Sequence, residues 1–370
     1  MRTDFSVSER SFLSLVSSGL WGRKPVSSAL RAADEAYACT DWERVLSLAR
    51  SQTVSGLLWR GVDMAMEEGL ELPETVLARL AAEVDACERR YARMQKLTLE
   101  LLAFYGSRGL HPVLLKGLDS AALYDIPSLR ESGDIDLYFS ENEFLAAIPK
   151  EAVHNADNSW SYVFRGVEVE LHDHILDIER PSARREAQRI ASESPSGSVE
   201  GLPAEVRGLS PRMRILLLSS HLLKHCLGRG IGLRQVCDYA LARAACDYDR
   251  RIFEADCRAL GLSRWVAVLD NLCVRHLGLD GNFSASYAER ERRRLDSLSD
   301  RLLRRLLDEG NFGRESGRGK GALNTFMAFL SNMGFSLKLA PGEAFYTVLS
   351  LAKGRLKKSS PSVKTQKRSL

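Results

Sequence analysis

Residues 114–139 have the sequence LLKGLDSAALYDIPSLRESGDIDLYF, and this stretch decides the fold. It begins inside a short apolar run over 113–115, which we interpret as a strand ending at the break Lys116-Gly117. It finishes with DIDLYF, where apolar and polar residues alternate with a period of two, so a second strand is predicted over 134–139. Between these strands the sequence predicts a short helix over 120–124 and a loop over 126–132.

Two further alternating runs follow this stretch. They cover 160–164 and 167–172, and the Arg165-Gly166 pair between them is a favourable hairpin turn. The polar segment 181–211 contains ESPSGS, and we interpret it as a loop or a broken helix outside the sheet. Strands mixed with helices, including one expected over 141–148, predict an α+β core.

Both flanks of this core have helical periodicity. Apolar residues recur at intervals of three and four from residue 8 to residue 108, and again from residue 213 onward. A last helix is expected over 323–356, interrupted at Pro341-Gly342. We therefore predict a helix-rich α+β protein, with a small mixed-sheet core between helical domains. The predicted units are an N-terminal helical domain over 1–85, the α+β core over 86–205, a C-terminal helical domain over 206–350 and a basic, disordered tail over 351–370.

The composition is that of a water-soluble globular protein, with 45% hydrophobic and 27% charged residues among 370. The 52 basic residues outnumber the 48 acidic ones, but seven of them lie in the last 18 residues, so the rest of the chain is slightly acidic. This charge distribution does not by itself imply binding to nucleic acid. The seven cysteines include no CxxC pair and are expected to be reduced core residues. We find no signal peptide or transmembrane run and predict a cytoplasmic protein.

The first candidate catalytic groups are two carboxylates on the strand predicted over 134–139. Asp134 and Asp136 are two residues apart, so both leave one face of the strand, while Ile135 and Leu137 enter the core. Neighbouring carboxylates repel each other unless a cation lies between them. Mg²⁺ prefers carboxylate and phosphate oxygens, so this pair is a candidate metal site for phosphoryl or nucleotidyl transfer.

The run VEVELH over 167–172 places Glu168, Glu170 and His172 on one face of its predicted strand. A neighbouring strand of this kind can supply a third carboxylate to a two-metal site. In such a site one ion activates an acceptor hydroxyl and the other holds a triphosphate. For Glu168, a solvated position on an edge strand is the alternative interpretation.

In combination these motifs resemble a known family. Residues 114–139 followed by VEVELH are similar to the uncharacterised nucleotidyltransferase family of bacteria, a branch of the DNA polymerase beta-like nucleotidyltransferase superfamily. The shared pattern is an apolar strand, Lys-Gly, a short helix with a Tyr, an Arg, an Asp-Ile-Asp-Leu strand and a strand with an acidic residue two before a His. The segments KHCLGRGIGLRQVCDYAL (224–241) and DEGNFG (308–313) are also similar, so the resemblance spans most of residues 30–315.

The resemblance implies an enzyme that moves a nucleoside monophosphate from an NTP to an acceptor with two Mg²⁺ ions. It implies that Asp134, Asp136 and Glu170 are catalytic and bind the metal. The implied nucleotide-binding residues are Lys116, Gly117, Ser120 and Arg130, with Gly117 in a turn at a helix N-terminus. One position departs from the wider superfamily, because Leu118 rather than Ser follows Gly117.

Further candidates lie in and before the segment 224–241. The implied substrate-binding residues are His172, Lys224, His225, Arg234 and Asp238. For Arg234 and Asp238 an i,i+4 ion pair is the alternative interpretation. His221 and His225 have the spacing of a zinc-binding helix, but Leu222 occupies the place of the catalytic Glu and no third ligand is evident.

The sequence leaves the acceptor open: a small molecule, a sugar phosphate, a protein or an RNA end. A rival interpretation is a catalytically degenerate nucleotide-binding or scaffold protein of the same fold. Retention of the three carboxylates favours the enzyme, and the missing Ser after Gly117 favours the rival. The basic tail is expected either to be solvated or to make weak contact with an anionic membrane or RNA.

Overall fold

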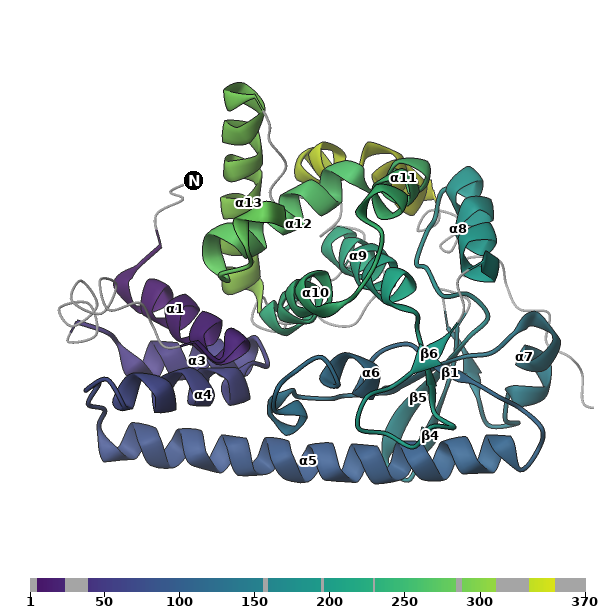
Figure 1. Cartoon of the computed structure of the whole chain (residues 1–370), viewed down its shortest axis with the longest axis horizontal. Coiled ribbons are helices and arrows are strands. Elements are labelled where there is room, and N and C mark those ends of the chain that lie inside the picture. Colours follow the sequence, from purple (N-terminus) through teal and green to yellow (C-terminus); the bar gives the residue numbers. More distant parts are fainter. Residues whose placement is uncertain are drawn as a thin grey trace, which may run out of the picture.

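The computed structural model describes residues 5–23, 39–155, 159–193, 196–228, 230–283, 288–310 and 333–349. It is helix-rich and contains one mixed sheet, which confirms the α+β prediction. Figure 1 shows the N-terminal helices at one end of the molecule and the sheet at the other, with a long helix running beneath both and the C-terminal helices above. The predicted tail over 351–370 lies outside the described residues.

The sheet has seven strands in the order β3-β4-β5-β2-β1-β7-β6. They are β1 (Val113–Leu114), β2 (Ile135–Tyr138), β3 (Val153–His154), β4 (Trp160–Phe164), β5 (Val167–His172), β6 (Gly197–Ser198) and β7 (Arg207–Gly208). β2 pairs in parallel with β5 and β1 with β7, whereas the other neighbouring strands are antiparallel. The two strands predicted to carry carboxylates, β2 and β5, are therefore direct neighbours.

The hairpin of β4 and β5 forms at the predicted turn. Arg165 and Gly166 both have positive φ angles, 48° and 81°. Two successive positive φ angles are typical of a type I′ turn, whose twist matches that of the strands it joins. The turn sets the register of β5, in which Val169 and Leu171 are fully buried.

The interpretation of 181–211 as a loop or a broken helix outside the sheet is correct for its helical first part and wrong for its last part. Its first part forms α8 (Pro181–Glu193), where Ala183, Ala187 and Ile190 make a buried stripe at helical spacing. Its last part supplies β6 and β7, which extend the sheet beyond β1. Strands of two residues are too short to display an alternating pattern, so the polar composition of this segment concealed them.

Helices form most of the remaining described chain. They are α1 (Val7–Trp21), α3 (Trp42–Ser51), α4 (Ser55–Met66), α5 (Glu74–Gly106), α6 (Leu118–Ala121), α7 (Glu141–Ala147), α9 (Pro211–Leu227), α10 (Leu233–Ala245), α11 (Arg250–Leu260), α12 (Ser263–His276), α13 (Glu289–Glu309), two short 3-10 helices (Pro127–Leu129 and Gly281–Phe283) and two helices over 333–339 and 341–349. The last two are separated just before Pro341, as predicted, and the rest of the helix expected over 323–356 lies outside the described residues. Within the described ranges, no helix combines the length and apolar character needed to cross a bilayer.

α1 and α4 approach each other closely because Gly61 has no side chain. A Cβ at Gly61 would lie only 1.9 Å from the carbonyl oxygen of Leu15, so any larger residue would push the two helices apart. This contact anchors the N-terminal helices, whose apolar faces are buried against each other.

The buried apolar residues form two clusters, and α5 contributes to both. Val76 and Leu80, near its start, belong to the larger cluster, which the N-terminal and C-terminal helices share. Leu97 and Leu101, further along, pack with the residues under the sheet. The predicted boundary between residues 85 and 86 therefore falls inside one continuous helix, and the division into domains stays a prediction.

The cysteines are free thiols and most lie in the core. Five are buried, namely Cys87, Cys226, Cys237, Cys257 and Cys273. Burial raises the pKa of the Cys87 thiol to about 12, which keeps it protonated and unreactive. This placement agrees with the expectation of reduced cysteines that pack as small apolar residues.

Candidate active site

Two parallel strands bring predicted catalytic carboxylates together. β2 and β5 are paired so that Asp136 lies opposite Glu170. Because successive side chains point to opposite faces of a sheet, these two leave the same face. Ile135 and Leu137 are buried in the cluster under the sheet, as predicted. Asp134 directly precedes β2 and is half-buried.

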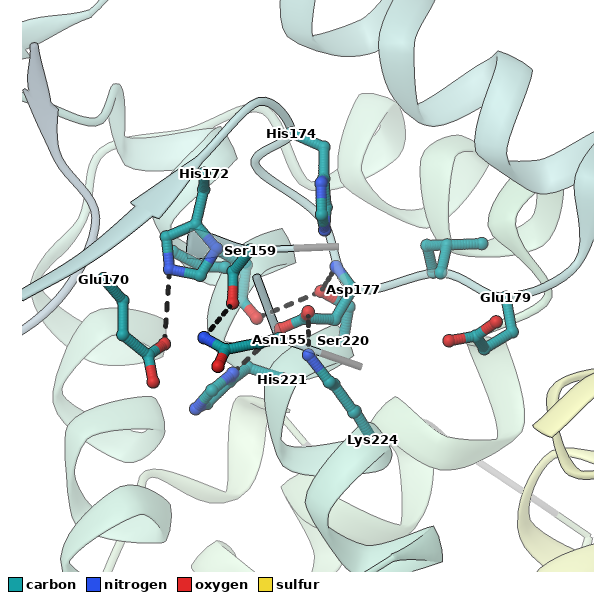
Figure 2. Close-up of polar contacts among 12 residues, drawn as sticks. Asn155, Ser159, Glu170, His172, His174, Asp177, Glu179, Ser220, His221 and Lys224 are labelled. Atoms are coloured by element: carbon teal, nitrogen blue, oxygen red, sulfur yellow. Dashed lines mark hydrogen bonds and ion pairs between the residues drawn. The ribbon is translucent and has the colours of Figure 1, made fainter. Parts of the chain in front are cut away.

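Asp136 is the centre of the polar contacts on this face. Its side chain is 1% exposed, and its Oδ1 lies 2.9 Å from Lys116 Nζ and 3.2 Å from His172 Nε2. The same His172 nitrogen lies 3.5 Å from Glu170 Oε2, a contact drawn in Figure 2. The second oxygen of Asp136, Oδ2, is buried and has no hydrogen-bond partner. A buried polar atom without a partner is costly, so a cation bound at Oδ2 would stabilise the site.

Neighbouring charges and burial shift the pKa values of Asp136 and of the titratable side chains around it. Burial alone would raise the pKa of Asp136, but Lys116 and His172 outweigh it and hold the pKa well below its usual value. Burial alone would lower the pKa of His172, but its hydrogen bonds to Asp136 and Glu170 raise it to about 9. The pKa of Lys116 is likewise raised, because Asp136 and Asp134 outweigh the effect of burial. Asp134 is the opposite case, since the charge of Asp136 and burial raise its pKa to about 6.

Three of these residues form a group that could hold a metal ion. One ligand atom from each of Asp136, Glu170 and His172 lies within 4.8 Å of the others, and no other group of three such residues occurs among the residues that the structure describes. The unpartnered Oδ2 of Asp136 fits a bound cation. The group contains His172 in place of Asp134, so metal binding by Asp134 stays a prediction.

The site lies within a segment that matches a known family. A model of an uncharacterised nucleotidyltransferase family matches residues 38–278, which is more than half of the chain. The chain belongs to this nucleotidyltransferase family. No curated protein and no solved structure matches it. Family membership supports nucleotidyl transfer as the general activity and an NTP as substrate.

The predicted nucleotide-binding turn at Gly117 has the expected backbone. Gly117 has a φ of 68° directly before α6, a conformation that favours glycine. Ser120 in α6 is 1% exposed, and its hydroxyl oxygen has no hydrogen-bond partner. Leu118, the residue directly after Gly117, is buried. Contact of Lys116, Gly117 and Ser120 with a nucleotide stays a prediction.

Arg130, another predicted nucleotide ligand, forms a buried ion pair with Asp238 from α10. Its Nε and one terminal nitrogen donate to the two carboxylate oxygens at 2.8 and 2.7 Å. The hydroxyl of Tyr124 donates to the same carboxylate at 2.7 Å. Arg234, four residues before Asp238, donates instead to the carbonyl oxygen of Glu131. The alternative of an Arg234–Asp238 ion pair is thus wrong, because Arg130 occupies the carboxylate that an i,i+4 pair would need.

A chain of polar contacts connects Lys116 with α9. Lys116 Nζ lies 3.4 Å from His221 Nε2, and His221 Nδ1 lies 2.8 Å from Asp177 Oδ2. Lys224 donates to the other oxygen of Asp177 at 2.7 Å, as Figure 2 shows. His225 is stacked edge-on against His221, with ring centroids 4.3 Å apart. His221 thus contacts Asp177 and Lys116, and binding of substrate by Lys224 and His225 stays a prediction.

Asp177 is the residue of this site that sequence reasoning missed. It lies in the irregular segment between β5 and α8, where no helical or strand periodicity predicts which way its side chain points. Burial alone would raise its pKa, but Lys224 and His221 hold it well below its usual value. Asp177 and Lys224 also line a pocket between α8, α9 and the helix over 341–349, together with Arg184 and Glu343. The only signal in the sequence was its closeness to VEVELH.

Proposed function

We propose that this protein is a Mg²⁺-dependent nucleotidyltransferase of the DNA polymerase beta-like kind. Its carboxylates Asp134, Asp136 and Glu170 would bind the metal, and an NTP would be the donor. The observation that carries the proposal is the pairing of Asp136 with Glu170 on adjacent parallel strands, with Asp136 Oδ2 buried and unpartnered. When bound, Mg²⁺ would neutralise charge on the triphosphate and activate the acceptor hydroxyl.

In the proposed reaction, the acceptor oxygen forms a bond to the α-phosphorus as the bond between the α- and β-phosphates breaks. Pyrophosphate leaves, and the hydroxyl proton passes to water. Lys116, whose ammonium group already lies beside Asp136, would contact the triphosphate. His221 and Asp177 would hold Lys116 in place from the opposite side.

The direct test is transfer of label from each α-labelled NTP to pools of small molecules, sugar phosphates, proteins and RNA. We expect one NTP to label one pool, with release of pyrophosphate in equal amount and loss of both products in EDTA. Tight, metal-dependent binding of a non-hydrolysable NTP without any transfer would favour the rival function. That rival, a degenerate nucleotide-binding or scaffold protein, is supported by the burial of Leu118 and Ser120 in α6, directly after the turn at Gly117.

Substitution of Lys116 tests its contact with the triphosphate. A charge-assisted hydrogen bond contributes about 1.5–3 kcal/mol, so Lys116→Ala should raise the KM for NTP roughly 10–100-fold and lower kcat less. Steady-state kinetics with varied NTP measures this split. The control is Lys150→Ala, an exposed lysine between α7 and β3. An unchanged KM for NTP in Lys116→Ala would leave Lys116 with a structural role as the partner of Asp136.

Deletion of residues 353–370 tests the basic tail. The carboxylates lie in the sheet, so the truncated protein should bind nucleotide with the same affinity and the same metal dependence. Any affinity for anionic liposomes or RNA should disappear with the deletion, and in the full chain it should weaken as salt increases. Loss of transfer to a small-molecule acceptor on truncation would contradict the predicted separation of tail and site.

A further inference from the structure

The candidate metal group has one nitrogen donor among its oxygen donors. Asp136 and Glu170 contribute carboxylates from neighbouring strands, and His172 contributes an imidazole from the strand of Glu170. His172 Nε2 is directed between the two carboxylates, at 3.2 Å from Asp136 Oδ1 and 3.5 Å from Glu170 Oε2. Figure 2 shows this imidazole turned toward Glu170. The three side chains therefore lie close enough to ligate one ion, whose binding would release to solvent the proton that His172 Nε2 shares with the two carboxylates.

A second observation points to a cation at this position. Asp136 is 1% exposed, and its Oδ2 is buried without a hydrogen-bond partner. Its Oδ1 already contacts both Lys116 and His172. Buried polar atoms in folded proteins are nearly always satisfied, so a buried, unpartnered oxygen on one of the three grouped side chains is suited to contact with a bound cation.

Asp134 does not belong to this group. It precedes β2, is half-buried and lacks a ligand atom within the 4.8 Å cluster. The three predicted metal ligands are thus not equivalent. Asp136 and Glu170 belong to a position that the protein alone assembles, whereas a position at Asp134 would need oxygens from the nucleotide to be complete.

We propose that Asp136, Glu170 and His172 form a metal position that selects a first-row transition-metal dication over Mg²⁺ and binds it before the nucleotide. The proposal deepens the proposed function, because it makes the two metal positions of that site chemically different. Imidazole nitrogen is a good ligand for transition metals, whereas Mg²⁺ favours all-oxygen coordination and keeps most of its water. The Mg²⁺ of the proposed reaction would then be the ion that arrives with the triphosphate at Asp134.

The test uses Mn²⁺ as the probe on the full chain without nucleotide. Titration calorimetry should give one Mn²⁺ site that Mg²⁺ displaces only at much higher concentration. Pulsed electron paramagnetic resonance of the bound Mn²⁺ should detect a directly coordinated nitrogen. Both signals are independent of any catalytic activity.

His172→Gln should abolish the nitrogen signal and weaken Mn²⁺ binding by at least about 10–100-fold, since loss of even an outer partner of a metal ligand costs that much. Its affinity for Mg²⁺ should change little. The matched control is His174→Gln, two residues further on, whose Nδ1 contacts Asp173 and whose ring lies 6.1 Å from that of His172. It should retain the nitrogen signal and the Mn²⁺ affinity.

Glu170→Gln is a second variant in case His172→Gln does not fold, because Glu170 is 27% exposed and its loss leaves the core intact. It should weaken both Mn²⁺ and Mg²⁺ binding while the nitrogen signal persists at saturating Mn²⁺. Equal affinity of the wild type for the two ions, or a nitrogen signal that survives in His172→Gln, would overturn the inference. Selective Mn²⁺ binding in a protein that transfers no nucleotide would instead uphold the inference and refute the proposed function.

Discussion

Asp136→Asn should abolish nucleotidyl transfer. The change removes the negative charge of the carboxylate that contacts both Lys116 and His172. The second oxygen of this carboxylate is the buried, unpartnered Oδ2 that would bind the metal ion. A metal ion stabilises the transition state of such reactions by several kcal/mol, so kcat should fall by about 10³-fold or more. The measurement is single-turnover transfer from labelled NTP at saturating metal, with circular dichroism to verify the fold. Full activity in Asp136→Asn would remove this site from the mechanism.

Asp134→Asn separates the loss of a proposed metal ligand from damage to the fold. The raised pKa of Asp134, about 6, means that its charged form is disfavoured in the folded protein. When the pKa of an acid is higher in the folded protein than in the unfolded chain, the free energy of unfolding falls as the pH rises above the unfolded-state pKa. The full loss is reached above the folded-state pKa. In EDTA at pH 7, Asp134→Asn should therefore raise the Tm, whereas Asp136→Asn should lower it because the pKa of Asp136 is depressed. A Tm that falls in both variants would contradict this assignment of charge.

The parts of the fold that sequence predicted are those that local chemistry dictates. The alternation in VEVELH and the Arg165-Gly166 turn determine which residues of β5 are buried and where the hairpin closes. The same alternation in DIDLYF places Asp136 on the face of β2 opposite Ile135 and Leu137, which are buried in the apolar cluster under the sheet. The resemblance then supplied Glu170 as a third carboxylate, and the pairing of β2 with β5 puts it opposite Asp136.

Other parts of the site depend on contacts between distant segments. The contact of Lys116 with His221 joins residues 105 apart, and that of Arg130 with Asp238 joins residues 108 apart. No periodicity encodes such partners, because they follow from the tertiary packing of α9 and α10. For the same reason sequence placed Arg234 beside Asp238 on one helix but did not reveal that Arg130 holds that carboxylate.

Asp238→Asn should strongly destabilise the protein. Arg130 and Asp238 are 5% and 2% exposed and make two charge-assisted hydrogen bonds, so removal of one charge leaves the other buried without a counterion. Breaking a buried pair in this way typically costs about 3–5 kcal/mol. The free energy of unfolding, measured by urea denaturation, should fall by that amount.

The double variant Arg130→Met/Asp238→Leu determines whether this pair serves the fold or the nucleotide. Replacement of both charges by apolar side chains of similar size is often nearly neutral, so the double variant should recover most of the stability that Asp238→Asn loses. If Arg130 only holds α10 against the loop before β2, the double variant should also bind NTP with the wild-type Kd. If the double variant is stable but binds NTP much more weakly than the wild type, Arg130 is a nucleotide ligand. NTP binding would then need the guanidinium even where the fold does not.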